Sequence, residues 1–207
     1  MSRILKHIVS QIGTALTVFS HGLLELNQPM ASAIRNSLNV WSNNAFMVVN
    51  IGYNTTDITV IKKRRILSHN SISIAYDTFI QDIIVFMGRK HNARVDESMA
   101  KRIMDTIGSA VSELDNPPPK CNVIVPNKTT ALPMRIPLSH EDIADILNFD
   151  LEKFGHIIVR ILESMELKVQ GEIYECGIQF WGEGTAIRGL AHKMEEITTF
   201  PCHIVLN

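Results

Sequence analysis

Three consecutive segments after residue 45 carry β-strand patterns, and they constrain the fold more than any other part of the chain. Phe46–Ile51 is a compact apolar run that is typical of a buried strand. Thr56–Ile61 alternates and is rich in β-branched residues, and Ile66–Ile74 follows a short basic turn. Because connections this short join antiparallel neighbours, the sequence predicts a three-stranded antiparallel meander.

The segments after the meander carry helical patterns. Asp77 is the expected N-cap of a helix that Gly88 ends, and Asp96 is the expected N-cap of the next helix. The apolar positions of that second helix are Met99, Ile103, Ile107 and Val111. Ser139 and Asp142 resemble a capping box, which opens a long amphipathic helix that extends to about Met165.

The last third of the chain predicts a strand–helix–strand unit. Gly177–Trp181 is expected to be a strand, Thr185–Ile197 a helix and Pro201–Leu206 a final strand, while Cys121–Pro137 holds short strand-like pieces. The predicted order is one helix, three strands, two helices, a variable middle region, the long helix and then βαβ. This order indicates a mixed α/β fold.

Composition and charge exclude several classes of protein. The 20 basic and 21 acidic residues give a net charge of −1, and the only dense basic run is Lys62–Arg65, so no nucleic-acid partner is expected. The three cysteines form no C-x-x-C pair, and the eight histidines have no metal-ligand spacing, so neither a metal site nor a disulfide framework is predicted. No uncharged apolar run reaches the ~18 residues that a membrane span needs.

Two glycine-containing turns are the candidate sites. In Gly52–Thr56, small residues between two strands let backbone N–H groups approach an oxyanion, and threonine hydroxyls add donors. Gly182–Thr185 lies at a predicted strand-to-helix junction, where free N–H groups and the helix dipole suit a phosphate. Each pattern is also that of an ordinary turn, so the turns alone leave both interpretations open.

Four segments occur in a fixed order along the chain and give these turns a context. They are Leu26–Ile34, Phe46–Ile61, Ala100–Ala110 and Gly177–Leu190. Together they resemble the MreB family of bacterial actins. That family has a glutamate-glutamate-proline-methionine-alanine element, a strand–turn–strand of the form D-I-G-G-G-T-T-E, a helix, and finally a strand, a G-G-G-A turn and a helix. The resemblance covers about residues 26–205.

The resemblance implies an α/β, actin-like (ribonuclease H-like) fold. The chain would hold the second domain of that fold with an inserted α+β subdomain, and the first domain would be missing. Residues 26–87 and 138–207 would form the core domain, 88–137 the inserted smaller subdomain and 1–25 a remnant leading helix. By this resemblance, the family's N-terminal phosphate loop, which belongs to the first domain, would have no counterpart here.

The resemblance also implies a site for ATP with Mg²⁺. The phosphate-binding residues would be Gly52, Tyr53, Asn54, Thr55 and Thr56. The residues that face the ribose and base would be Lys101 and Met104, and the adenosine turn would be Gly182, Glu183, Gly184 and Thr185. Asn27 and Gln28 stand at the position of the family's water-orienting glutamates, and no other catalytic residue is predicted.

Several of these positions depart from the family pattern. Tyr53 and Asn54 replace glycines, Ala75 and Tyr76 replace a glycine pair, Asn50 replaces an aspartate, and Lys101 and Met104 replace a glutamate and a lysine. Glu183 replaces a glycine and puts a carboxylate where it would repel a polyphosphate. Gln28 can orient water but cannot act as a base. We therefore expect ATP hydrolysis to be weak or absent.

By the same resemblance the protein is expected to act in the cell-shape cytoskeleton, in the cytoplasm and at the inner face of the cell membrane. Its expected partners are copies of itself or a full-length MreB-like paralogue. The amphipathic stretch Ile4–Phe19 would pack on the sheet or make a peripheral membrane contact. Two alternatives stay open: a non-enzymatic pseudo-ATPase interaction module that associates with the paralogue, and a decaying gene fragment.

Overall fold

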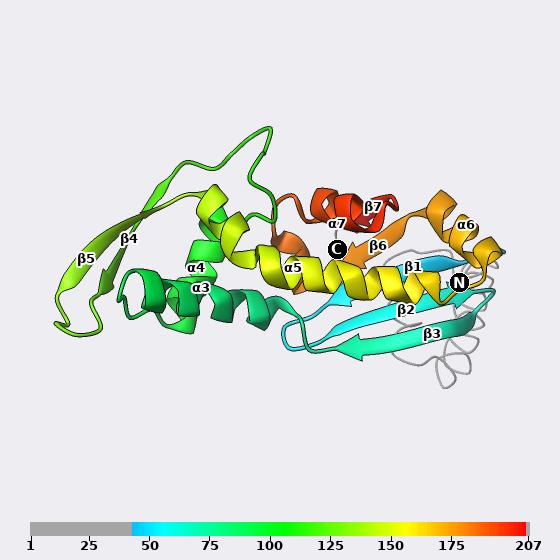
Figure 1. The fold of residues 1–207 in the computed structure, drawn as a ribbon, viewed down its shortest axis with the longest axis horizontal. Coiled ribbons are helices and arrows are strands. Elements are labelled where there is room, and N and C mark those ends of the chain that lie inside the picture. Colours follow the sequence, from blue (N-terminus) through cyan, green and yellow to red (C-terminus); the bar gives the residue numbers. More distant parts are fainter. Residues whose placement is uncertain (1–42, 206–207) are drawn as a thin grey trace, which may run out of the picture.

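A five-stranded sheet forms the centre of the computed structural model, which describes residues 43–205 (Figure 1). Its strand order is β3-β2-β1-β6-β7. β1 (Phe46–Ile51), β2 (Thr56–Lys62) and β3 (Arg65–Ile72) pair antiparallel, which confirms the predicted meander. β6 (Ile178–Trp181) pairs parallel with β1, and β7 (Cys202–Ile204) pairs parallel with β6.

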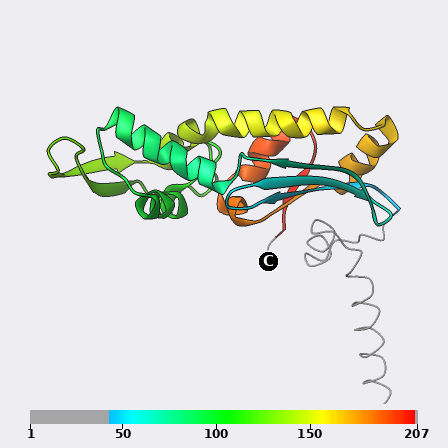
Figure 2. The ribbon, with the colours of Figure 1, turned by 90° about the horizontal axis from the view of Figure 1, so that it is seen from below.

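Two helices cover one face of this sheet (Figure 2). The long helix α5 (His140–Glu163) lies across the sheet, and α7 (Leu190–Thr198) packs against both α5 and β7. Phe154 of α5 and Phe180 of β6 are buried and meet edge to face, with their ring centroids 6.5 Å apart. Apolar packing of this kind is what holds α5 on the sheet.

The rest of the described chain extends away from the sheet and gives the molecule an elongated shape (Figure 1). α3 (Tyr76–Lys90) and α4 (Glu97–Ile107) lead from the sheet to a two-stranded ribbon, β4 (Cys121–Pro126) and β5 (Pro133–Leu138). Alternate residues of the ribbon join the same apolar core, as expected for strands with one buried face. They are Val123, Val125, Ile136 and Leu138.

Two of the predicted helix starts are confirmed by their capping bonds. At α5, Ser139 Oγ accepts from the N–H of Asp142 at 3.3 Å, and Asp142 Oδ2 accepts from the N–H of Ser139 at 2.8 Å. At α4, Asp96 Oδ1 accepts from the N–H of Met99 at 2.8 Å. α4 ends at Ile107, so Val111 lies beyond the helix on which the sequence pattern placed it.

The predicted limits of α3 are wrong at both ends. The helix begins at Tyr76 rather than after Asp77, because its first amides bond to carbonyls of the β1–β2 turn and need no side-chain cap. It also continues through Gly88 to Lys90, since buried Met87 keeps the last turn on the core and a glycine weakens a helix by only about 1 kcal/mol.

Two further predictions are corrected in the last third of the chain. The helix expected at Thr185–Ile197 is divided: Glu183–Ala186 forms a 3₁₀ turn (η1), and α7 starts only after Gly189, whose φ of 72° interrupts the helix. In addition, α6 (Leu167–Cys176) was not predicted. The expected leading helix, residues 1–25, lies outside the described residues.

Candidate functional site

The two glycine-containing turns lie at the same edge of the sheet. β1 and β6 are parallel neighbours, with Asn50 opposite Trp181, so the turns that follow them leave the sheet side by side. Their backbones also approach closely: a Cβ on Gly182 would lie 2.4 Å from the carbonyl oxygen of Ile51, and one on Gly184 would lie 2.2 Å from Ile51 Cγ2. Only glycine fits at these positions without rearrangement.

The β1–β2 turn uses part of its hydrogen-bonding capacity internally. Gly52 N–H donates to Thr55 O at 3.0 Å, and the carbonyls of Gly52 and Tyr53 accept from the first two amides of α3, at 3.1 and 2.8 Å. Within residues 43–205, the N–H groups of Tyr53, Asn54 and Thr55 find no acceptor. Three adjacent free amides are a suitable binding surface for an anion.

The threonines of the two turns differ in what they can offer to a ligand. Thr56 is fully buried, and its hydroxyl donates to Ile74 O at 2.7 Å. The hydroxyl of Thr185 likewise donates to Gly182 O at 2.7 Å. Thr55 is exposed, so its hydroxyl is the threonine donor that remains accessible at this edge.

α4 faces the β1–β2 turn with a stripe of charged residues. Glu97, Lys101 and Asp105 follow each other at intervals of four and therefore share one face of the helix. Lys101 Nζ lies 4.8 Å from the ring centroid of Tyr53 and 5.8 Å from that of Tyr76. The hydroxyl of Tyr53 donates to Glu97, and that of Tyr76 donates to Asp105 at 3.4 Å.

The two tyrosine rings complete this arrangement, which we call the tyrosine–lysine cluster: Tyr53, Tyr76, Glu97, Lys101 and Asp105. The ring centroids of the two tyrosines are 6.2 Å apart, and the rings are tilted by 56°. A cation held against two aromatic faces gains from the negative potential of each ring. The cluster thus connects the β1–β2 turn, the start of α3 and two turns of α4.

The phenols of the cluster are neutral hydrogen-bond donors near pH 7. The hydrogen bond to Glu97 is the main cause that raises the pKa of Tyr53 to about 12, and the charges of Asp77 and Glu183 act in the same direction. Burial is the main cause that raises the pKa of Tyr76 to about 12, followed by Asp105. The exposed side chain of Glu183 therefore contributes negative charge to the same region as the tyrosines.

The remaining predicted site residues are placed as follows. Met104 is only 4% exposed and packs in the core next to the cluster, whereas Lys101 is half-buried and reaches the turn. Asn54 is exposed on the turn. Asn27 and Gln28 lie outside the described residues.

Sequence reasoning did not single out Glu97 and Asp105, which complete the cluster. The available signal was their spacing of four residues on each side of Lys101 within a segment with a clear N-cap. That spacing predicts a shared helix face. It does not say which aromatic residues that face would meet.

As arranged, these residues do not fit ATP. The free amides of the turn and Lys101 suit a phosphate, but the side chain of Tyr53 bridges the turn and α4 across the space between them. Three carboxylates, Asp77, Glu97 and Glu183, act on the hydroxyl of Tyr53. Among the described residues, no group of three or more histidine, cysteine or acidic side chains is placed to hold a metal ion.

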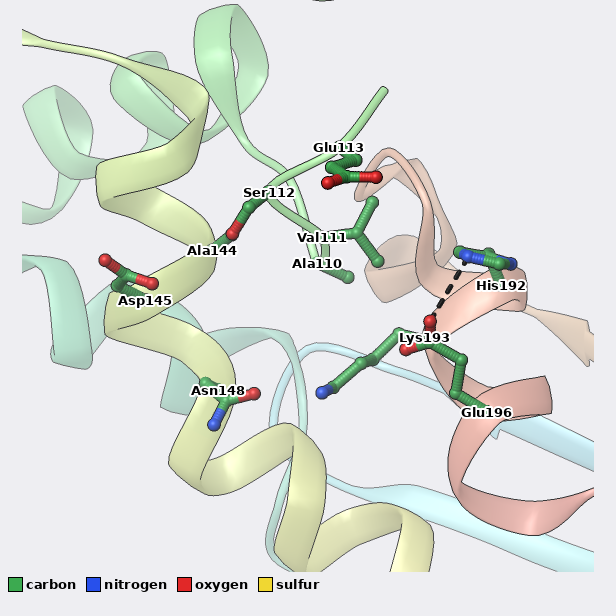
Figure 3. A pocket seen from close by; sticks show the side chains of 10 residues that line it. All are labelled: Ala110, Val111, Ser112, Glu113, Ala144, Asp145, Asn148, His192, Lys193 and Glu196. Atoms are coloured by element: carbon green, nitrogen blue, oxygen red, sulfur yellow. Dashed lines mark ion pairs between the residues drawn. The ribbon is translucent and has the colours of Figure 1, made fainter. Parts of the chain in front are cut away.

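A cavity of about 260 Å³ lies outside this cluster, between α5 and α7 (Figure 3). It contains none of the catalytic or ligand-binding residues predicted from the sequence. The segment 110–113 closes one end, and Asn148 of α5 lies opposite α7. Lys193 pairs with Glu152 at 2.7 Å and His192 lies 3.3 Å from Glu196, so the charged groups on its α7 side have partners within the fold.

Within the part of the chain that the structure describes, no helix is both long and apolar enough to cross a lipid bilayer.

Comparisons with solved structures match the architecture to actin-like proteins. MreB 5 of Spiroplasma citri, in a crystal structure bound to AMPPNP, is 24% identical and superposes with a TM-score of 0.79 over 84% of this chain and 51% of its own. A second crystal structure of that protein is bound to ADP. A MamK double helical filament gives a TM-score of 0.62 at 17% identity, over 78% of this chain and 50% of its own. The predicted actin-like α/β fold is confirmed.

Sequence comparisons give relatives with a stated role. The cell shape-determining protein MreB of Escherichia coli (strain K12) is 29% identical over 181 residues, which are 85% of this chain and 50% of the relative. The cell shape-determining protein Mbl of Bacillus subtilis (strain 168) is 23% identical over 187 residues, 90% of this chain and 55% of the relative. The chain spans about half the length of the curated relatives it matches.

The family model described as MreB/Mbl protein matches residues 4–207, which is nearly the whole sequence. This match includes both glycine-containing turns and the helix that faces them, so it agrees with the four sequence segments and with the fold. The chain belongs to the MreB/Mbl protein family.

Proposed function

We propose that this protein is part of the cell-shape cytoskeleton, and that it binds nucleotide weakly and hydrolyses it slowly or not at all. The observation that carries the proposal is the convergence at one sheet edge of the β1–β2 turn, α4 and the turn after β6. These are the segments that would face phosphate, ribose and adenosine by family resemblance. The nucleotides in the structures of MreB 5 from Spiroplasma citri support the ligand class.

The charges of the site support weak binding. The charges of Asp77, Glu97 and Glu183 all act on Tyr53 of the phosphate-facing turn, and the ammonium group of Lys101 lies over the ring of the same tyrosine. A polyphosphate without a compensating metal would be repelled by this surplus of carboxylates. The groups of this chain that would contact the phosphates are the free amides of the turn and the ammonium group of Lys101.

Slow hydrolysis follows from the lack of acidic groups at two positions. Asn50 lies near the end of β1, and its side-chain oxygen is close to Gly182. By the family resemblance, the position of Asn50 is one where the family has an aspartate near the metal. Gln28 stands where a family glutamate orients the attacking water, and an amide there accepts no proton. Thr55, with its exposed hydroxyl, remains the accessible side-chain donor of the turn.

The test combines calorimetry with a turnover assay on the full chain. Titration with ATP and Mg²⁺ should give weak binding that Thr55→Ala weakens further, and phosphate release should stay at background. As a matched control, Thr106→Ala changes an exposed threonine of α4 whose hydroxyl bonds only within the helix, to Arg102 O at 2.6 Å. Steady turnover that Thr55→Ala abolishes and Thr106→Ala preserves would refute the slow-hydrolysis half of the proposal.

A second candidate is a non-enzymatic pseudo-ATPase interaction module that associates with a full-length paralogue. The favouring observation is the contrast between a fully packed core, with Phe79, Phe154 and Phe180 buried, and a candidate site filled by its own side chains. The filament of the structural relative MamK supports self-association. Pull-down with a full-length paralogue tests this candidate, and a lack of association with and without nucleotide counts against it.

Location and domain division belong to the same proposal. We place the protein in the cytoplasm, at the inner face of the cell membrane, by analogy with the cell shape-determining relatives. Residues 26–87 and 138–207 would act as the actin-like core domain, with 88–137 as an inserted subdomain. The position of the β4–β5 ribbon, at the end of the molecule away from the main sheet, supports this division (Figure 1).

A further inference from the structure

We propose that Tyr53 closes the candidate nucleotide site from within and that a nucleotide binds only after displacing its side chain. The proposal rests on the proposed function, because it takes the β1–β2 turn and α4 to be the two sides of that site. The ring of Tyr53 extends from the turn to α4, where its hydroxyl meets Glu97 in the first helical turn and its face meets Lys101 one turn later. It therefore occupies the space that a ligand between these elements needs.

The closed arrangement is anchored on both sides. On the turn side, the carbonyls of Gly52 and Tyr53 accept from the amides of Tyr76 and Asp77, so the turn is fixed to the start of α3. On the other side, Glu97 lies in the first turn of α4 and Lys101 follows one turn later, in a helix that Asp96 caps. The side chain of Tyr53 is the link between these two anchored parts, and it can rotate without breaking either of them.

Lys101 has one role in the closed form and another in the open form. In the closed form its ammonium group lies against the rings of Tyr53 and Tyr76, 4.8 and 5.8 Å from their centroids. Once the ring of Tyr53 leaves, the ammonium group still lies beside the turn whose amides are free, and there it offsets the charge of a phosphate. Nucleotide and Tyr53 therefore compete for the same cation as well as for the same space.

With competition of this kind, the apparent Kd equals the Kd of the open site divided by the fraction of molecules in the open form. If about one molecule in ten is open, the apparent Kd is about tenfold weaker than the Kd of the open site. Removing the ring while keeping Lys101 should recover that factor. Removing Lys101 should not, because the open site then loses its cation.

The test is titration of the full chain with ATP and Mg²⁺ by calorimetry. Tyr53→Gly should bind more tightly than wild type by a factor equal to the inverse of the open fraction, which is about tenfold if one molecule in ten is open. Glu97→Gln, which keeps the ring but weakens its anchoring bond, should fall between the two. Tyr174→Ala is the matched control, since it removes a 54% exposed tyrosine from α6 at the opposite end of the sheet and should leave the affinity unchanged. Binding by wild type that Tyr53→Gly leaves equal or weaker would overturn the proposal.

A second measurement needs no nucleotide and so separates this proposal from the proposed function. In the proton NMR spectrum, the ε-methylene of Lys101 should be shifted upfield by the ring of Tyr53, and Lys101→Met assigns that signal. The shift should largely disappear in Tyr53→Gly and persist in Tyr174→Ala. Absence of the shift in the wild-type protein would overturn the closed arrangement. If the shift is present but no variant binds nucleotide, the contact between Tyr53 and Lys101 is confirmed. In that case the competition with nucleotide is refuted, and so is the nucleotide binding in the proposed function.

Discussion

Replacing Asp82 of α3 with asparagine should stabilise the protein at alkaline pH more than at acidic pH. Asp82 Oδ2 is buried and has no hydrogen-bond partner among residues 43–205, and Asp150 of α5 lies beside it. Burial is the main cause that raises the pKa of Asp82 from 3.8 to about 7, and the neighbouring charge of Asp150 raises it further. The contact between α3 and α5 thus contains a carboxyl group that prefers to be protonated.

The size of the effect follows from proton linkage. Between pH 3.8 and about 7 the folded state keeps a proton that the unfolded state has released, so the free energy of unfolding falls as the pH rises through this window. At about 1.4 kcal/mol per pH unit the upper limit is about 4 kcal/mol. Because Asp82 is only partly buried, solvent screening reduces the expected loss to about 1–2 kcal/mol. Asparagine cannot ionise and avoids this loss, while its amide can donate to Asp150.

Urea unfolding followed by circular dichroism measures the effect. The difference in unfolding free energy between Asp82→Asn and wild type should grow by about 1–2 kcal/mol between about pH 4.5 and about pH 8. Asp145→Asn is the matched control, because it removes an exposed carboxylate from α5 and should give a difference that hardly depends on pH. A difference for Asp82→Asn that is the same at both pH values would refute the reasoning.

Two further predictions concern packing and use the same urea assay. Phe180→Ala leaves a cavity at a fully buried position of β6 and should lower the unfolding free energy by about 3–5 kcal/mol. Phe149→Ala is the control, because Phe149 is 76% exposed and its loss should change the unfolding free energy by less than about 1 kcal/mol. Equal effects of the two substitutions would contradict the assigned core. Gly184→Ala should destabilise the fold, because the added Cβ would lie 2.2 Å from Ile51 Cγ2. Gly171→Ala is the control: a Cβ at this position of α6 has no neighbour within 4 Å, and alanine should raise the unfolding free energy by up to about 1 kcal/mol. A neutral Gly184→Ala would show that the two turns are not closely packed.

Much of the fold could be predicted from local patterns. The meander follows from three short β-branched segments with tight connections, and the starts of α4 and α5 follow from side-chain caps within four residues. α6 was missed because only Val169 and Ile173 are buried in it, which leaves too few apolar positions to define a helical period. The start of α3 could not be read locally either. Its first amides bond to Gly52 and Tyr53, more than twenty residues earlier in the chain.

The candidate site was predictable only in part, for a related reason. Family resemblance predicted which segments belong together, and parallel pairing of β1 with β6 places two of them at one edge. The side-chain contacts across that edge depend on how α3 and α4 pack, and a sequence pattern does not carry that information. This is why Tyr53 and Tyr76 appear in the sequence as two separate replacements of glycine, and only in the fold as a pair of rings 6.2 Å apart.

The contacts within the tyrosine–lysine cluster bear on the alternative that the chain is a decaying gene fragment. Under unconstrained decay, replacements at site positions would have no reason to complement one another. By the family resemblance, Tyr53, Tyr76 and Lys101 would each depart from the family pattern. In the fold, the lysine of α4 lies against both rings, and both hydroxyls bond to carboxylates on the same helix. Independent replacements would not be expected to produce a cation, two neutral phenols and two carboxylates that complement each other in this way.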